Sequence, residues 1–241
     1  MCIRDRYGSN QLSALDHIRH LFYKETKVAV LGLPGGLDIW LFRNTEKLVE
    51  WAVAARDDYN TQGTHVDQMR PLFISILDYI DGSPNVHIDV PGGPVDADRT
   101  ISRVALLSVD TIQQQLSDVA NNPPGYLDHI PLHLNGVIKA PDATPEMRKL
   151  AAEIIDALTN ATQWLKDARI YARQLVQMNN NQLSQPEAIT MIDNLVTAVT
   201  YAYIGQLDPK TNTVKPGVLQ VHYDIQQLAA FTVTKNLPQS I

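Results

Sequence analysis

The most regular hydrophobic pattern in the chain lies between Thr144 and Asn181. With Met147 taken as heptad position a, apolar or aromatic residues fill positions a, d and e of the heptads there, which is typical of a helix face buried in a bundle. These positions are Met147, Leu150, Ala151, Ile154, Ala157, Leu158, Ala161, Trp164, Leu165, Ala168, Tyr171, Ala172, Leu175 and Met178. Thr144 suits an N-cap and Pro145 suits the first helical position. The pattern predicts one long helix at about 145–178, roughly 50 Å in length.

Helical spacing of apolar residues recurs on both sides of this segment. It predicts about seven helices in all, the others being expected at 10–31, 37–59, 65–80, 96–121, 185–206 and 218–233. Strands, if present, are expected only at 28–33 or 85–90. The predicted fold class is therefore mainly α, a helical bundle around one long central helix.

Four prolines make 122–144 the longest segment without a helical pattern, which predicts a functional loop or a linker. It separates an N-terminal helical part, 7–121, from a C-terminal helical part, 145–241, and we expect the two parts to pack as one domain. The first six residues, MCIRDR, resemble translated adaptor sequence from assembled environmental DNA. We expect residues 1–6 to be non-native and the native N-terminus to be missing.

Composition sets several function classes aside. The chain is 44% hydrophobic and carries a formal charge of −6, with its 20 basic residues scattered, so no nucleic-acid partner is expected. No uninterrupted apolar run is long enough for a transmembrane segment. The only cysteine, Cys2, lies in the suspect terminus, so neither a disulfide nor a catalytic thiol is expected. Abundant Asn and Gln favour an extracytoplasmic or cell-surface location over a cytoplasmic one.

The glycine-rich turn Gly32–Gly36 precedes a predicted helix, an arrangement that can bind phosphate. It lacks the Gly-Lys-Ser/Thr ending of a phosphate loop, and Asp38 places negative charge where phosphate would lie. We therefore interpret the turn as a helix terminator and hinge.

Two histidine pairs have spacings that could serve a ligand. His17 and His20 lie three residues apart, on one face of a predicted helix, with Asp16 and Glu25 nearby. They are candidate metal ligands, but no second motif completes a metal site, so no bound metal and no cofactor are expected.

The second pair, His129 and His133, lies in the predicted loop beside Asp128. Histidine in a loop can do acid–base work, but no nucleophile motif accompanies the pair, so no catalytic residue is assigned. Pro131 is expected to prevent the two histidines from sharing a regular helix face. The candidate ligand-binding residues are His129, His133, Asp128, Trp164 and Tyr171.

The function expected from the sequence is that of a non-catalytic helical bundle. It would act as a structural module or bind a protein partner, for instance at the cell envelope. The alternative is a bundle that binds a small ligand or a metal through histidines and aromatic residues between its helices. Convergence of histidines and carboxylates would favour the alternative, whereas an exposed apolar patch on a helix face would favour the interaction module.

Overall fold

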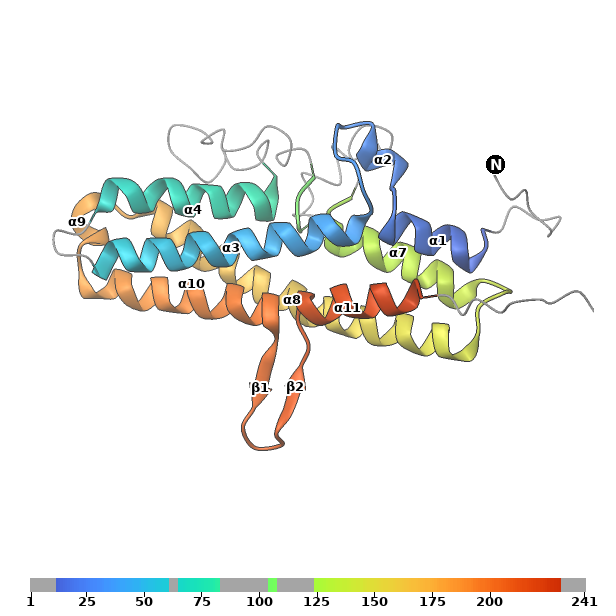
Figure 1. Ribbon diagram of the computed structural model, residues 1–241. Coiled ribbons are helices and arrows are strands. Elements are labelled where there is room, and N and C mark those ends of the chain that lie inside the picture. The colour runs from blue at the N-terminus through green and yellow to red at the C-terminus, as the bar shows by residue number, and fades with distance from the viewer. Residues whose placement is uncertain (1–11, 61–64, 83–103, 108–123, 231–241) are drawn as a thin grey trace, which may run out of the picture.

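The structure is a computed structural model that describes residues 12–60, 65–82, 104–107 and 124–230 of the 241-residue chain. These residues form a mainly α bundle (Figure 1). Its helices are α1 (Ala14–Phe22), α2 (Thr26–Ala29), α3 (Leu37–Asn60), α4 (Val66–Asp81), α7 (Tyr126–Lys139), α8 (Pro145–Gln177), α9 (Asn180–Leu183), α10 (Pro186–Ile204) and α11 (Val218–Leu228). The predicted fold class is confirmed.

Two long helices, α3 and α8, organise the bundle. At one end, α4 and α10 each pack against both of them, which gives a four-helix arrangement with α3 and α8 at opposite corners. At the other end, α7 and α11 take the places of α4 and α10 (Figure 1). There α1 packs against α7, α3 and α11, and it lies at the same corner of the bundle as the start of α3. The candidate site lies at this second end, between α1 and α7.

Helix α8 is the predicted central helix, and its heptad face forms much of the core. Every a and e position from Ala151 to Leu175 is buried, whereas the aromatic d residues Trp164 and Tyr171 are half-buried. The most deeply buried stripe is therefore rotated slightly toward the e positions. Thr144 is the N-cap, as predicted, because its hydroxyl accepts a hydrogen bond from the Met147 N–H at 3.2 Å.

The segment 10–31 is not one helix but two. The first begins after Ser13, which forms a capping box with Asp16, and ends at Phe22. The chain leaves the helix at Tyr23, and Glu25 then caps the single turn of α2. The strand considered for 28–33 is absent, since those residues belong to α2 and the turn that follows it. This break places Glu25 beside α1 instead of a turn further along it.

The strands described are in a place the sequence pattern did not predict. β1 (Gln206–Asp208) and β2 (Thr213–Lys215) form an antiparallel hairpin between α10 and α11, which projects from the side of the bundle (Figure 1). Gly205 has a φ of +92°, and a Cβ there would lie 2.4 Å from the Lys215 carbonyl oxygen. Glycine therefore permits both the backbone conformation and the close approach at the base of the hairpin.

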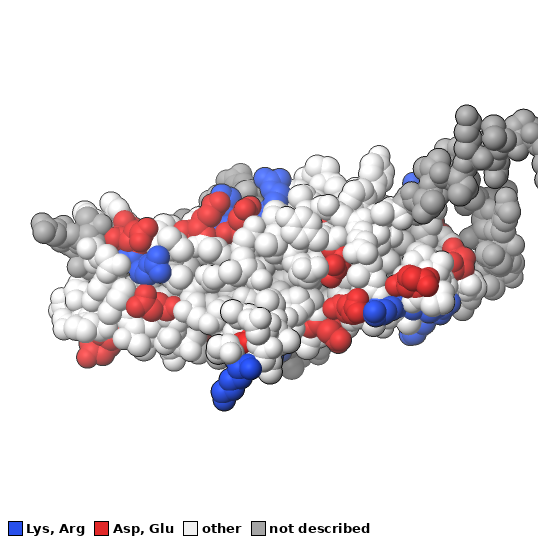
Figure 2. Space-filling model, turned by 60° about the horizontal axis from the view of Figure 1, so that its bottom comes forward, with Lys and Arg blue, Asp and Glu red and all other residues white. Residues whose placement is uncertain are grey.

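The other strand expectation, 85–90, and the predicted helix at 96–121 lie outside the described residues, apart from 104–107. Figure 2 shows one face of the molecule, on which acidic and basic side chains are scattered among wide uncharged areas. Within the described ranges, no helix combines the length and the apolar character needed to cross a membrane.

Candidate metal centre

Helix α1 carries the first two histidines on the flank of a short amphipathic helix. Ala14, Ile18 and Leu21 are buried and fix the inner face of α1 against the bundle. His17 and His20 lie beside that apolar stripe, so both rings remain near the packing surface instead of pointing to open solvent. The backbone N–H of Ala14 donates to Asp142 at 2.9 Å, which ties the start of α1 to the connection between α7 and α8.

Helix α7 carries the second pair, and here the sequence interpretation needs correction. Much of the expected loop 122–144 is helical, and α7 continues through Pro131. His129 and His133 therefore do share a helix face, and their rings stack with centroids 5.2 Å apart. Proline removes one backbone hydrogen bond from a helix interior. Burial of Leu127, Ile130, Leu134 and Val137 accompanies the helix and offsets that loss.

Glu25 completes the group from a third element, the N-cap of α2. One carboxylate oxygen, Oε1, accepts from the Lys27 N–H at 2.9 Å, and the backbone N–H of Glu25 donates to the Gly35 carbonyl at 3.1 Å. The residue is only 3% exposed. Its second oxygen, Oε2, is thereby held in the interior, facing the histidines.

Three potential ligand atoms meet at this point. Glu25 Oε2 lies 2.7 Å from His20 Nδ1 and 3.3 Å from His133 Nε2. Each of the three residues offers one ligand atom, and these atoms all lie within 4.8 Å of one another. Ligand atoms on a tetrahedral zinc ion would be about 3.3 Å apart, since each is about 2.0 Å from the ion. The observed spacing therefore fits one small metal ion after minor side-chain adjustment.

Two of these atoms lack the hydrogen bonds that buried polar atoms normally make. His20 Nδ1 and Glu25 Oε2 are close, but their orientation is not that of a hydrogen bond to any described residue. His129 Nδ1 is likewise buried without a hydrogen-bond partner among the described residues. A bound cation would satisfy the first two atoms by accepting their lone pairs.

The remaining histidines surround the three ligands. His17 Nδ1 lies 3.3 Å from His133 Nδ1, and the rings of His20 and His133 stack with centroids 4.7 Å apart. The His129 ring also stacks on that of His133, and His129 is 4% exposed. Four of the seven histidines in the chain thus form one cluster, and two of them, His20 and His133, contact the buried Glu25 carboxylate.

The pKa values of the residues in the cluster are shifted in different directions. Burial alone would raise the pKa of the Glu25 carboxyl, but the close approach of the His133 and His20 imidazoles outweighs it and holds that pKa well below its usual range. The adjoining Glu25 carboxylate raises the pKa of His20. Burial, reinforced by the neighbouring His133, lowers the pKa of His17 and lowers that of His129 to about 4. A neutral imidazole and an ionised carboxylate are the forms that bind metals.

His222, the last histidine on a described helix, lies in a different pair. Its Nδ1 is 2.7 Å from Asp38 Oδ2, and its ring stacks on Phe42 with centroids 4.4 Å apart. This contact joins α11 to the first turn of α3. Burial raises the pKa of Asp38 to about 6, although the nearby His222 opposes the shift. Asp38 thus links two helices, and its Oδ1 atom has no hydrogen-bond partner among the described residues.

The Asp38 pair predicts a pH-dependent difference in stability. Because the folded-state pKa of Asp38 exceeds the ordinary value of 3.8, the contribution of this carboxyl to stability is fully present below about pH 4 and is lost as the pH rises through about 6. Asp38→Asn removes this titration. The free energy of unfolding of both proteins would be measured by urea unfolding at pH 4 and pH 7.5. The difference between them should shift by about 2–3 kcal/mol in favour of the variant from the lower to the higher pH. A constant difference between the two proteins would contradict the assignment.

Three candidates from the sequence do not join the histidines. Asp128 is exposed on α7. Trp164 faces α10, where its ring lies 6.0 Å from that of Tyr201, and Tyr171 lies half-buried one heptad further along α8. Glu25, by contrast, is a central member of the cluster, although the sequence marked it only as an acidic neighbour of His17 and His20.

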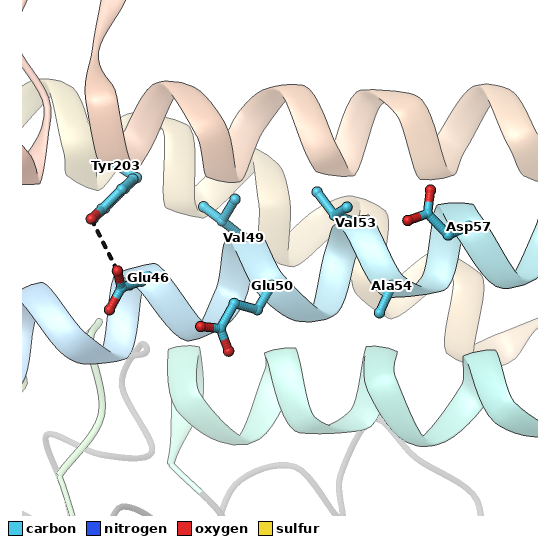
Figure 3. A pocket seen from close by; sticks show the side chains of 7 residues that line it. All are labelled: Glu46, Val49, Glu50, Val53, Ala54, Asp57 and Tyr203. Atoms are coloured by element: carbon cyan, nitrogen blue, oxygen red, sulfur yellow. Dashed lines mark hydrogen bonds between the residues drawn. The ribbon is translucent and has the colours of Figure 1, made fainter.

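A separate groove of about 530 Å³ runs along the exposed side of α3. Figure 3 shows Glu46, Val49 and Val53 lining it from α3, with Tyr203 reaching in from α10. The Tyr203 hydroxyl donates to Glu46 at 3.3 Å. Among the described residues that line the groove there is no histidine, and the carboxylates are spread along the helix, so they offer no comparable ligand set.

Comparison with protein families, curated proteins and solved structures found no match for this chain.

Proposed function

We propose that this protein binds one divalent transition-metal ion through His20, Glu25 and His133. The observation that carries the proposal is the convergence of these three side chains from α1, the N-cap of α2 and α7, with buried ligand atoms on His20 and Glu25 that have no hydrogen-bond partner among the described residues. Two imidazoles and one carboxylate suit zinc and the neighbouring first-row metals. Calcium and magnesium prefer sites made of oxygen ligands.

A purely structural ion pair is the competing explanation. One protonated histidine beside Glu25 would suffice to tie α1 to α2, and such a pair needs no further imidazoles. The cluster instead has four rings, of which His20 and His133 contact the carboxylate while His17 and His129 contact His133, and desolvation lowers the pKa of both His17 and His129. A single ion pair accounts for His20, whose pKa the Glu25 carboxylate raises, but it leaves the three other rings without a role.

Zinc is expected to bind with a stoichiometry of one ion per chain. Untagged protein would be treated with chelator, dialysed and titrated with Zn²⁺ by calorimetry, with elemental analysis of the product. At free zinc one hundred times the dissociation constant, binding should add about 2.7 kcal/mol to the free energy of unfolding. That gain corresponds to a rise of roughly 5–10 °C in the thermal midpoint.

The ligand variants His20→Ala, Glu25→Gln and His133→Ala should each lose most of the zinc affinity. The matched control is His65→Ala, which removes an exposed histidine at the start of α4. Circular dichroism of the metal-free proteins would verify that each variant is folded. Absence of zinc binding by the wild type, or equal binding by the wild type and His133→Ala, would overturn the proposal. The expectation of no bound metal, drawn from the sequence, would then hold.

The interaction module expected from the sequence stays a second proposal, and one observation favours it. Leu207 and Val214 are directly paired across the projecting hairpin and are 55% and 59% exposed. Apolar side chains presented together on a protruding element are common where proteins meet. Metal binding at the α1–α7 end of the bundle and protein binding at the hairpin are compatible.

A further inference from the structure

His133 faces a different partner with each of its two ring nitrogens. Its Nε2 lies 3.3 Å from Glu25 Oε2, and its Nδ1 lies 3.3 Å from His17 Nδ1. A neutral imidazole carries one N–H, so only one of the two nitrogens has a lone pair free for a metal. For Nε2 to bind the ion, the proton must be on Nδ1.

His17 is placed to accept that proton in a hydrogen bond. If His133 Nδ1–H donates to His17 Nδ1, then Nε2 of His133 presents its lone pair beside Glu25. If His17 Nδ1–H donates instead, the His133 proton is on Nε2 and blocks the metal. Histidine ligands in metal sites commonly donate their other N–H to an acceptor, which fixes the tautomer and the ring orientation.

Gly136 explains how the His17 ring can reach this position. A Cβ at residue 136 would lie 2.3 Å from Cε1 and 2.4 Å from Nε2 of the His17 ring. Glycine in a helix interior costs about 1 kcal/mol relative to alanine. Despite this cost, α7 has a glycine at the position where the ring of His17 lies against its backbone.

We infer that His17 is a positioning residue for the metal site, which holds the His133 side chain with Nε2 directed at the ion. The inference rests on the proposed metal binding. His17 does not itself belong to the group of ligand atoms within 4.8 Å of one another. Its role is to accept the Nδ1 proton of His133 and to orient that ring, while Gly136 leaves the space that His17 needs.

Two isosteric substitutions separate the hydrogen bond from the bulk of the ring. Asparagine places an amide oxygen two bonds from Cβ, as histidine places Nδ1, whereas leucine places a methyl group there. His17→Leu should bind Zn²⁺ about 10–100-fold more weakly than the wild type. His17→Asn should stay within about threefold, because it keeps an acceptor for the His133 N–H. Thermal midpoints of the metal-free proteins would report any general loss of structure.

Gly136→Ala provides a second, independent variant. Alanine is the better helix former, so α7 itself is not weakened, but the new methyl group would displace the His17 ring. Zinc affinity should fall as it does in His17→Leu, although no ligand is changed. The ¹⁵N shifts of the zinc-bound wild type should also show His133 protonated at Nδ1.

The outcomes distinguish the inference from the proposed function. Zinc binding by the wild type with equal affinity in His17→Leu would overturn the role of His17 and leave the metal site standing. Equal losses in the Leu and Asn variants would also overturn it, because bulk and not the hydrogen bond would then matter. Failure of the wild type to bind zinc would overturn both.

Discussion

Replacing Leu158 or Leu165 by alanine is expected to lower the free energy of unfolding by about 2–5 kcal/mol. Both side chains are at most 1% exposed on α8, which packs against α4, α7, α10 and α11. Each truncation removes buried apolar surface and leaves a cavity that neighbouring helices fill only in part. Urea unfolding followed by circular dichroism would measure the change in the transition midpoint.

Lys166→Ala is the control for this pair. It lies next to Leu165 in the sequence but is exposed on the outer face of α8, so its free energy of unfolding should change by no more than about 0.5 kcal/mol. If all three variants unfolded at the same urea concentration, the assignment of the buried face of α8 would be wrong.

Helix α8 shows what hydrophobic spacing can predict. Its heptad pattern persists over most of its 33 residues, so the apolar side chains can lie on one side only if the segment is helical. Thr144 and Pro145 mark its start through local chemistry that does not depend on the rest of the fold. The same reasoning holds for α3, whose observed bounds, Leu37–Asn60, differ little from the predicted 37–59.

Local rules were less reliable where tertiary packing opposes them. Pro131 breaks a backbone hydrogen bond and suggested a loop, but α7 buries enough apolar surface to keep its helix. The hairpin was missed for a different reason. Each strand has three residues, too short for an alternating pattern to be recognised, and its pairing depends on Gly205 and Gly217 at its base.

The candidate site was predicted in pieces but not as a whole. Both histidine pairs stood out by spacing, yet His17 and His133 are 116 residues apart, and no local pattern reports that α1 packs on α7. Helical continuity through Pro131 was the missing step, because it places His129 and His133 on one face. Glu25 could be recognised only once α1 was known to end at Phe22.

The glycine turn between α2 and α3 has a role beyond ending a helix. A Cβ on Gly36 would lie 2.3 Å from the Leu21 carbonyl oxygen and 2.5 Å from the Phe22 carbonyl carbon. These are backbone atoms at the end of α1, so no side-chain rotation can relieve the overlap. The preceding residue, Gly35, accepts the backbone hydrogen bond of Glu25. The turn thus fixes the position of the Glu25 carboxylate relative to the end of α1.

Gly36→Ala is therefore expected to lower the free energy of unfolding by about 3 kcal/mol or more, at the upper end of the cost of overpacking. It should also weaken zinc binding, because moving the turn away from α1 shifts Glu25 relative to His20. Gly32→Ala is the matched control in the same turn. Gly32 has a φ of +84° but no atom within 4 Å of an added Cβ, so it should cost only the backbone strain of about 1–2 kcal/mol. Urea unfolding and zinc calorimetry of both variants would test this, and equal effects at the two glycines would contradict the predicted overlap of an alanine at position 36 with the end of α1.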